Sequence, residues 1–121
     1  MPIGLKRAYE PAEPSDGERY LVERLWPRGV KKEDLALTGW LKAVAPSTEL
    51  RKWYGHQPER QPEFARRYRA ELALPETQPA LLELAHRARA GKVTLVFSTR
   101  ETELSGAVVL QEVLEEQTRD A

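Results

Sequence analysis

A chain of 121 residues is long enough for one compact domain with its own hydrophobic core. Its 19 basic and 19 acidic residues cancel, so no overall field draws it toward nucleic acid or an anionic membrane, and any preference for anions must be local. The absence of cysteine excludes disulfides and thiolate chemistry, and the lack of an apolar leader or spanning segment predicts a cytoplasmic protein with no membrane partner.

The first part of the chain predicts two strands followed by a helix. Apolar and polar residues alternate over residues 3–9 (IGLKRAY) and again over residues 19–26 (RYLVERLW), as in half-buried strands. The Pro-rich loop between them is shorter than a usual parallel crossover, so we expect the two strands to be antiparallel or not to be neighbours. From Lys31 the apolar periodicity is that of a helix, which includes Trp40 and ends before Pro46.

The second part predicts three helices, a buried strand and a last helix. The first helix lies within residues 46–56, with Ser47 or Thr48 as its N-cap and Gly55 as its stop, and the next two lie within residues 61–74 and 77–91. Residues 92–100 (KVTLVFSTR) are apolar on both faces, as in a central strand covered from both sides. A helix within residues 104–118 would cover that strand, and a frayed tail is expected over about residues 116–121.

The order of these elements predicts an α/β fold. We expect a single three-layer domain over residues 1–121, with a small, mostly parallel or mixed sheet of about three strands and helices on both faces. In open α/β sheets, ligands gather beyond the carboxyl ends of the parallel strands. This rule draws attention to residues 24–29 (RLWPRG) and residues 98–106 (STRETELSG), each of which follows a predicted strand.

The polar side chains of these two segments predict a local anion site. Guanidinium groups are planar donors that suit carboxylate or phosphate, and the backbone N–H groups at the start of the last helix can complete an anion cradle. Arg51, on the first of the three helices, is a further candidate, although it could simply belong to a solvated helix face. The candidate ligand-binding residues are Arg24, Arg28, Arg51, Ser98, Arg100 and Ser105.

Glu23 and His56 are the candidates for moving a proton. Each also has a structural interpretation: Glu23 can form an ion pair with Arg24 that ties the sheet to a helix, and His56 follows Gly55, where a cation meets the negative end of a helix dipole. Two histidines far apart in a chain without cysteine predict no metal site. No phosphate-loop or nucleophile-elbow motif is present, so no cofactor is expected.

Four segments carry a resemblance to a known family: LVERLWPRGVKKEDL, WLKAVAPSTELRKWYGH, EFARRYRAEL and VTLVFSTRETELSGAVVL. Together they resemble the YeaO-like family of uncharacterised bacterial proteins, catalogued as domain of unknown function 488. The resemblance covers nearly the whole chain. It implies a single cytosolic α/β domain, and it supplies no established activity, substrate or catalytic residue.

Three classes of function remain open at this stage. The preferred one is a small cytosolic enzyme or ligand-binding domain that acts on a small anionic molecule. The second is a nucleic-acid-associated or regulatory module that uses the basic residues between positions 51 and 69, but acidic neighbours there favour a salt-bridged surface. The third is a structural or interaction subunit, such as a homodimer with Trp40, Trp53 or Tyr54 as exposed anchors.

Overall fold

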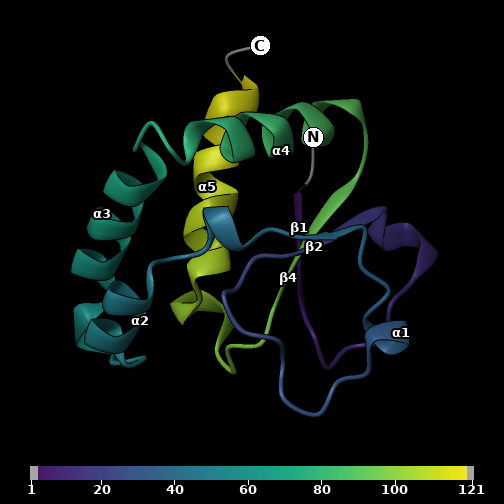
Figure 1. Cartoon of the computed structure of the whole chain (residues 1–121), viewed down its shortest axis with the longest axis horizontal. Helices are drawn as coiled ribbons and strands as arrows, with labels where there is room; N and C mark the ends of the chain where they lie inside the picture. The colour runs from purple at the N-terminus through teal and green to yellow at the C-terminus, as the bar shows by residue number, and fades with distance from the viewer. Residues whose placement is uncertain (1–2, 120–121) are drawn as a thin grey trace.

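The computed structural model describes residues 3–119 and places a small parallel sheet at the centre of the fold (Figure 1). The strands are β1 (Ile3–Arg7), β2 (Glu18–Leu21), β3 (Gly39–Trp40) and β4 (Val93–Phe97), in the spatial order β1-β4-β2-β3, and every pair is parallel. The predicted α/β class is therefore confirmed. β1 and β2 pair with β4 on opposite sides, so these two strands are not neighbours and their antiparallel alternative is wrong.

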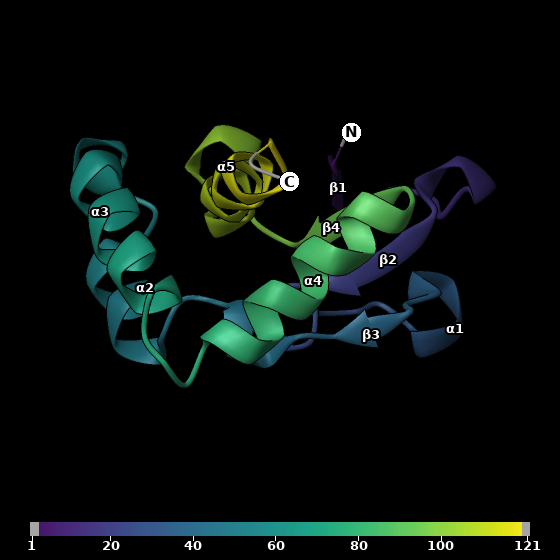
Figure 2. The same cartoon turned by 90° about the horizontal axis from the view of Figure 1, so that it is seen from above.

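Four helices gather on one face of the sheet. They are α2 (Thr48–Tyr54), α3 (Gln61–Leu72), α4 (Gln78–Ala90) and α5 (Gly106–Arg119), and their buried residues form the main core with Val93, Leu95 and Phe97 of β4. Figure 2 shows α5 next to the sheet, with α2 and α3 farther out on the same side. All five residues of β4 are buried, which confirms the prediction of a central strand.

The opposite face of the sheet is covered more thinly. Leu21 and Val96 form a small second core there with Leu35 of α1 (Lys32–Leu35), a helix of a single turn. The predicted helices on both faces are present, but the two faces are covered very unequally (Figure 2). Within residues 3–119, every helix falls short of the length and apolar character that a membrane span requires.

The prediction of one long helix from Lys31 to just before Pro46 is wrong. α1 ends after one turn because Ala36 adopts a left-handed conformation (φ 48°), and the chain then forms the short strand β3 at the edge of the sheet. The N–H groups of Thr38 and Leu41 donate to the carbonyls of Arg19 and Leu21 in β2. Pairing with β2 therefore overrides a helical pattern that was weak at Thr38 and Gly39.

Some element boundaries differ from the prediction, and others agree with it. β2 ends at Leu21, so residues 22–26 belong to a loop instead of a strand. α5 remains helical through Arg119, so the expected frayed tail does not begin at about residue 116, and residues 120–121 lie outside the described residues. For α2 the expected ends are confirmed: the Ser47 hydroxyl accepts from the Leu50 N–H, and Gly55 is left-handed.

The outer edge of β1 is occupied at both ends by side chains. Gln111 of α5 donates its amide N–H to the carbonyl of Ile3 at 2.6 Å. The Glu10 carboxylate accepts from the backbone N–H of Arg7 at 2.7 Å. Two backbone groups that point away from β4 are thus satisfied within the chain.

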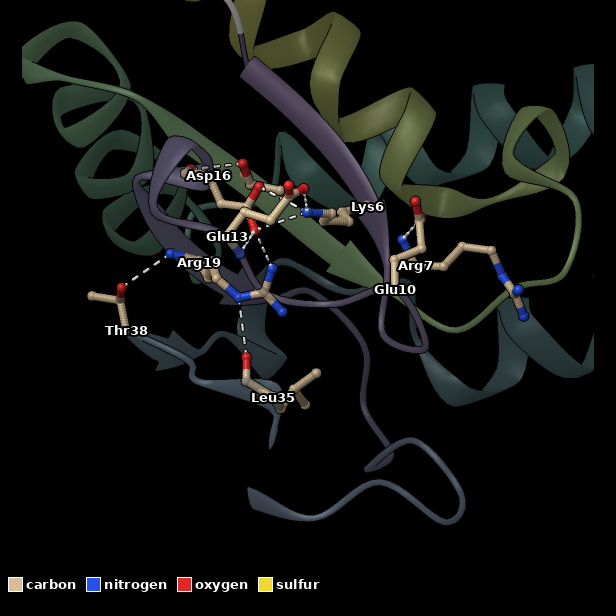
Figure 3. Close-up of polar contacts among 9 residues, drawn as sticks. Lys6, Arg7, Glu10, Glu13, Asp16, Arg19, Leu35 and Thr38 are labelled. Atoms are coloured by element: carbon tan, nitrogen blue, oxygen red, sulfur yellow. Dashed lines mark hydrogen bonds and ion pairs between the residues drawn. The ribbon is translucent and has the colours of Figure 1, made fainter. Parts of the chain in front are cut away.

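A buried ionic cluster ties β1 to β2 across the central strand (Figure 3). Asp16, which is only 7 % exposed, accepts from Lys6 of β1 at 3.0 Å and from the Arg19 guanidinium of β2 at 2.7 Å. Thr94 of β4 donates its hydroxyl to the Asp16 carbonyl at 2.7 Å. Burial opposes the charge of Asp16, but hydrogen bonds from the Glu13 N–H, Lys6 and Arg19 outweigh it and hold the pKa of Asp16 below its usual value.

Replacing Asp16 tests how much this cluster stabilises the fold. Asp16→Asn should lower the free energy of unfolding at pH 7 by roughly 3 kcal/mol, because Lys6 and Arg19 lose their shared carboxylate. The lowered pKa of Asp16 stabilises the fold above pH about 4, and this stabilisation is lost as the pH falls through the pKa of Asp16 in the folded state. The difference in unfolding free energy between wild type and Asp16→Asn should therefore shrink in acid. Urea unfolding of both proteins at several pH values measures this difference. A difference that does not change with pH would contradict the prediction.

Gly17 is a second sensitive position, because it packs against the start of β4. Its φ is 67°, and a Cβ atom there would lie 2.3 Å from the carbonyl oxygen of Lys92. Gly17→Ala should therefore destabilise the protein by roughly 2 kcal/mol or more in urea unfolding. Gly91→Ala is the matched control, since Gly91 is extended (φ −177°) with open space around it. Equal stability of the two variants would refute this account.

Candidate anion-binding site

A cavity of about 390 Å³ opens at the carboxyl edge of the sheet. Because all the strands are parallel, the segments that follow β1, β2 and β4 leave the sheet at this one edge. The cavity lies between these segments, the start of α5 and the side of α2. This is the position in which open α/β sheets bind ligands.

The cavity brings together seven of the eight residues that the sequence singled out: Glu23, Arg24, Arg28, Arg51, His56, Ser98 and Arg100. The eighth, Ser105, is not among the lining residues. Its hydroxyl donates to the Thr102 carbonyl at 2.6 Å and accepts from the Val108 N–H at 3.3 Å, so it is buried as the cap of α5. Gly106 and Ala107, at the start of that helix, line the cavity in its place.

Arg24 is fixed by backbone carbonyls and not by an acid. Its Nε donates to the carbonyl of Pro46 at 2.9 Å, and its Nη2 donates to that of Ala45 at 3.4 Å. Within residues 3–119 it forms no ion pair, so the alternative in which Arg24 closes on Glu23 is wrong. Arg24 instead ties the loop after β2 to the segment before α2.

The other three arginines of the cavity are exposed and have no carboxylate partner in the described part of the chain. They are Arg28, Arg51 and Arg100. Each comes from a different segment: the loop after β2, helix α2 and the loop after β4. Three guanidinium groups from three parts of the chain therefore border one cavity with their donors open to a ligand.

The loop that carries Arg28 is held in place on both sides. Gly29 has φ 78° in a turn closed by the Val30 N–H and the Pro27 carbonyl, and Trp26 donates its indole N–H to the Val30 carbonyl at 2.7 Å. From the other side, the Tyr9 hydroxyl donates to the carbonyl of Arg28 at 3.1 Å. The side chain of Arg28 extends from a backbone that is anchored at several points.

Glu23 links the loop after β2 to the loop after β4 through a hydrogen bond with Ser98. The Ser98 hydroxyl donates to Oε1 of Glu23 at 2.6 Å, across 75 positions of sequence. The Trp40 indole N–H donates to the carbonyl of Glu23 at 2.5 Å. The sequence predicted Ser98 as a ligand contact, whereas its hydroxyl proton is directed to Glu23.

His56 stands on the cavity wall in an uncommon backbone conformation. Its φ is 56°, which is left-handed, and its ring centroid lies 5.9 Å from that of Tyr54. For a residue other than glycine this conformation costs roughly 1 kcal/mol, and such strain is concentrated at functional sites. The position after α2 also suits a cation at the helix C-terminus, so both interpretations of His56 stay open.

Several cavity residues were missed by the sequence interpretation. Tyr54 and Phe64 stack with ring centroids 4.1 Å apart, and the Tyr54 hydroxyl donates to the Leu104 carbonyl at 2.9 Å. Burial raises the pKa of Tyr54, which keeps the phenol a neutral donor. Tyr9 was assigned to the first strand, and nothing local in the sequence places it at the same edge as Arg28.

Within the described residues, the basic residues of α3 have protein partners, unlike the exposed arginines of the cavity. Glu63 accepts from both Arg66 and Arg67 of α3, and these hydrogen bonds lower the pKa of Glu63 to about 2. Arg67 also lies over the ring of Trp53, with its guanidinium 4.3 Å from the ring centroid. Trp53 is half-buried and Tyr54 is 3 % exposed, so neither is the exposed anchor that the sequence suggested.

The fold and the arginine-lined cavity define an α/β domain that matches a family model along residues 2–121. That model is described as "Inactive DUF488-N3 subclade", and the chain belongs to this family, which confirms the resemblance seen in the sequence. Two of its relatives are the uncharacterized protein YeaO of Escherichia coli K12, 46 % identical over 94 % of this chain and 97 % of the relative, and the uncharacterized protein Rv3073c of Mycobacterium tuberculosis H37Rv, 46 % identical over 93 % and 92 %. No solved structure matches the chain significantly.

Two arginine variants separate a structural role from a ligand-binding role. Arg24→Ala should lower the free energy of unfolding by roughly 2 kcal/mol, because the carbonyls of Ala45 and Pro46 lose a charged donor. Arg28→Ala should change it by less than about 0.5 kcal/mol, since that side chain is exposed. Urea unfolding of both variants provides the measurement. Equal losses of unfolding free energy would contradict the assignment of a structural role to Arg24 and not to Arg28.

Proposed function

We propose that this chain is a ligand-binding domain that holds a small anionic molecule in the cavity at the carboxyl edge of its sheet. The observation that carries the proposal is the set of exposed guanidinium groups of Arg28, Arg51 and Arg100, which border one cavity and form no ion pair within residues 3–119. The surface arginines Arg66 and Arg67, by contrast, each form an ion pair with Glu63.

The charge of the cavity supports an anion as its ligand. Its lining has four arginines and one glutamate, so these side chains leave three positive charges. The chain as a whole carries no net charge, so this field is local and attracts anions over about one Debye length, roughly 8–10 Å. Guanidinium groups bind carboxylate and phosphate with paired hydrogen bonds, which makes these the ligand groups of first choice.

Binding without turnover is preferred to catalysis. The family model is described as an inactive subclade, which favours a protein that retains a site but not a reaction. Glu23 and His56 line the cavity and remain the candidates for proton transfer in the enzyme alternative. A cytoplasmic location is part of the same proposal.

The two other classes of function receive less support. The basic residues of α3 are largely neutralised by Glu63 and Glu116, which argues against a continuous surface for nucleic acid. A homodimer anchored on Trp53 and Tyr54 would require side chains that are covered in the monomer. Trp40 is 36 % exposed and lies against Trp26 and Lys42, which makes it a weak anchor by itself.

A titration with inorganic phosphate tests the proposal. In amide-resolved NMR, phosphate should shift the signals of residues 23–28 and 98–107, and added chloride salt should weaken the binding. Arg28→Ala and Arg100→Ala should each weaken it about tenfold, which is the effect of one charged hydrogen bond. Arg66→Ala is the matched control, because that arginine lies outside the cavity and pairs with Glu63. Shifts that are absent, or that respond equally to all three substitutions, would contradict an anion site.

A further inference from the structure

Glu23 is an unexpected residue in a cavity that attracts anions. Glu23 lines the same cavity as four arginines, and yet no arginine nitrogen is within 4.0 Å of its carboxylate oxygens in the described part of the chain. Oε1 is occupied by the Ser98 hydroxyl, whereas Oε2 has no protein donor among residues 3–119. The cavity therefore presents open donors and an open acceptor at the same time.

The opposite charges are kept apart by neutral partners. Arg24, the next residue in the chain, is held by the carbonyls of Ala45 and Pro46 on one side of the loop. Glu23 is held by the Ser98 hydroxyl and, through its own carbonyl, by Trp40. A ligand can therefore bind both the arginines and Glu23 without first breaking an ion pair between them. The free energy of breaking such a pair does not reduce its affinity.

We propose that the ligand carries a hydrogen-bond donor, an ammonium or a hydroxyl group, in addition to its anionic group, and that Oε2 of Glu23 accepts from it. This inference rests on the proposed function, because the arginines hold the anionic group. Glu23 then determines specificity: a simple anion meets a nearby carboxylate that repels it, whereas a zwitterion or a hydroxylated anion satisfies that carboxylate.

The size and walls of the cavity fit such a bifunctional molecule. A volume of about 390 Å³ exceeds what an inorganic anion alone would fill. Part of the lining is apolar, with Val22, Phe97 and the stacked rings of Tyr54 and Phe64. The class of ligand is thus an organic acid or phosphate ester in which a short apolar body separates the anion from the donor.

Two probes that differ only in the donor test the inference. O-phosphoethanolamine and ethyl phosphate share a phosphate and a two-carbon body, but only the first has an ammonium group. In NMR titrations of the wild-type chain, we expect O-phosphoethanolamine to bind roughly tenfold more tightly, which corresponds to one hydrogen bond to a charged group. A simple cation, ethylammonium, should not bind, because the arginines repel it.

The variant Glu23→Gln separates recognition from folding. Glutamine keeps an oxygen that can accept from the Ser98 hydroxyl, so the loop contact should persist and thermal unfolding should change little. O-phosphoethanolamine should lose its tenfold advantage, and ethyl phosphate should bind as well as before or better, since a negative charge has gone. Glu103→Gln, an exposed acid outside the cavity lining, is the matched control and should behave like wild type.

The outcomes separate the two proposals. If ethyl phosphate binds wild type as tightly as O-phosphoethanolamine does, or if Glu23→Gln retains the difference, the donor inference is wrong while the anion site stands. If neither phosphate compound shifts the cavity signals in any variant, the anion site fails together with the inference. A selective loss of the O-phosphoethanolamine advantage in Glu23→Gln alone supports both.

Discussion

The pairing of β4 with both β1 and β2 is the constraint from which the rest of the structure follows. A strand from near the C-terminus lies between the two strands of the N-terminus, and each interface is parallel. All the strands then end at the same edge, and the segments that follow β1, β2 and β4 meet there. The cavity is a consequence of this topology, because residues 9, 23–28 and 98–107 are far apart in the sequence and close only through β4.

Charge is handled in two different ways at the two ends of the sheet. Near the beginning of β2, Asp16 forms ion pairs with Lys6 and Arg19, and the carboxylate lies largely buried between the two cations. At the carboxyl edge, Arg24 and Glu23 are adjacent in sequence but are bound to backbone carbonyls and a hydroxyl. Removing one member of the first group would leave a buried charge unpaired, whereas the separated groups at the carboxyl edge are free to recognise a ligand.

Much of the fold was predictable from sequence because its elements are strongly patterned. The caps of α2 at Ser47 and Gly55, and the doubly apolar β4, have local physical causes that a sequence displays. β3 was not predictable, since two residues become a strand only where β2 offers an open edge. The same limit applies to the cavity: Arg24, Arg28 and Arg100 were found through the strand-end rule, but Tyr9 and the Ser98–Glu23 contact depend on pairing across the sheet. The place of Tyr54 depends on how α2 packs against Phe64 and Leu104.

The side chains on the outer edge of β1 have a consequence for how the protein behaves in a crowded solution. An open parallel sheet has two edges, and a free edge strand is a template for another chain. On this molecule Gln111 and Glu10 occupy backbone groups at the two ends of β1, and the opposite edge is a strand of only two residues. Within residues 3–119 neither edge offers a long run of free backbone, so the sheet resists edge-to-edge aggregation and strand exchange.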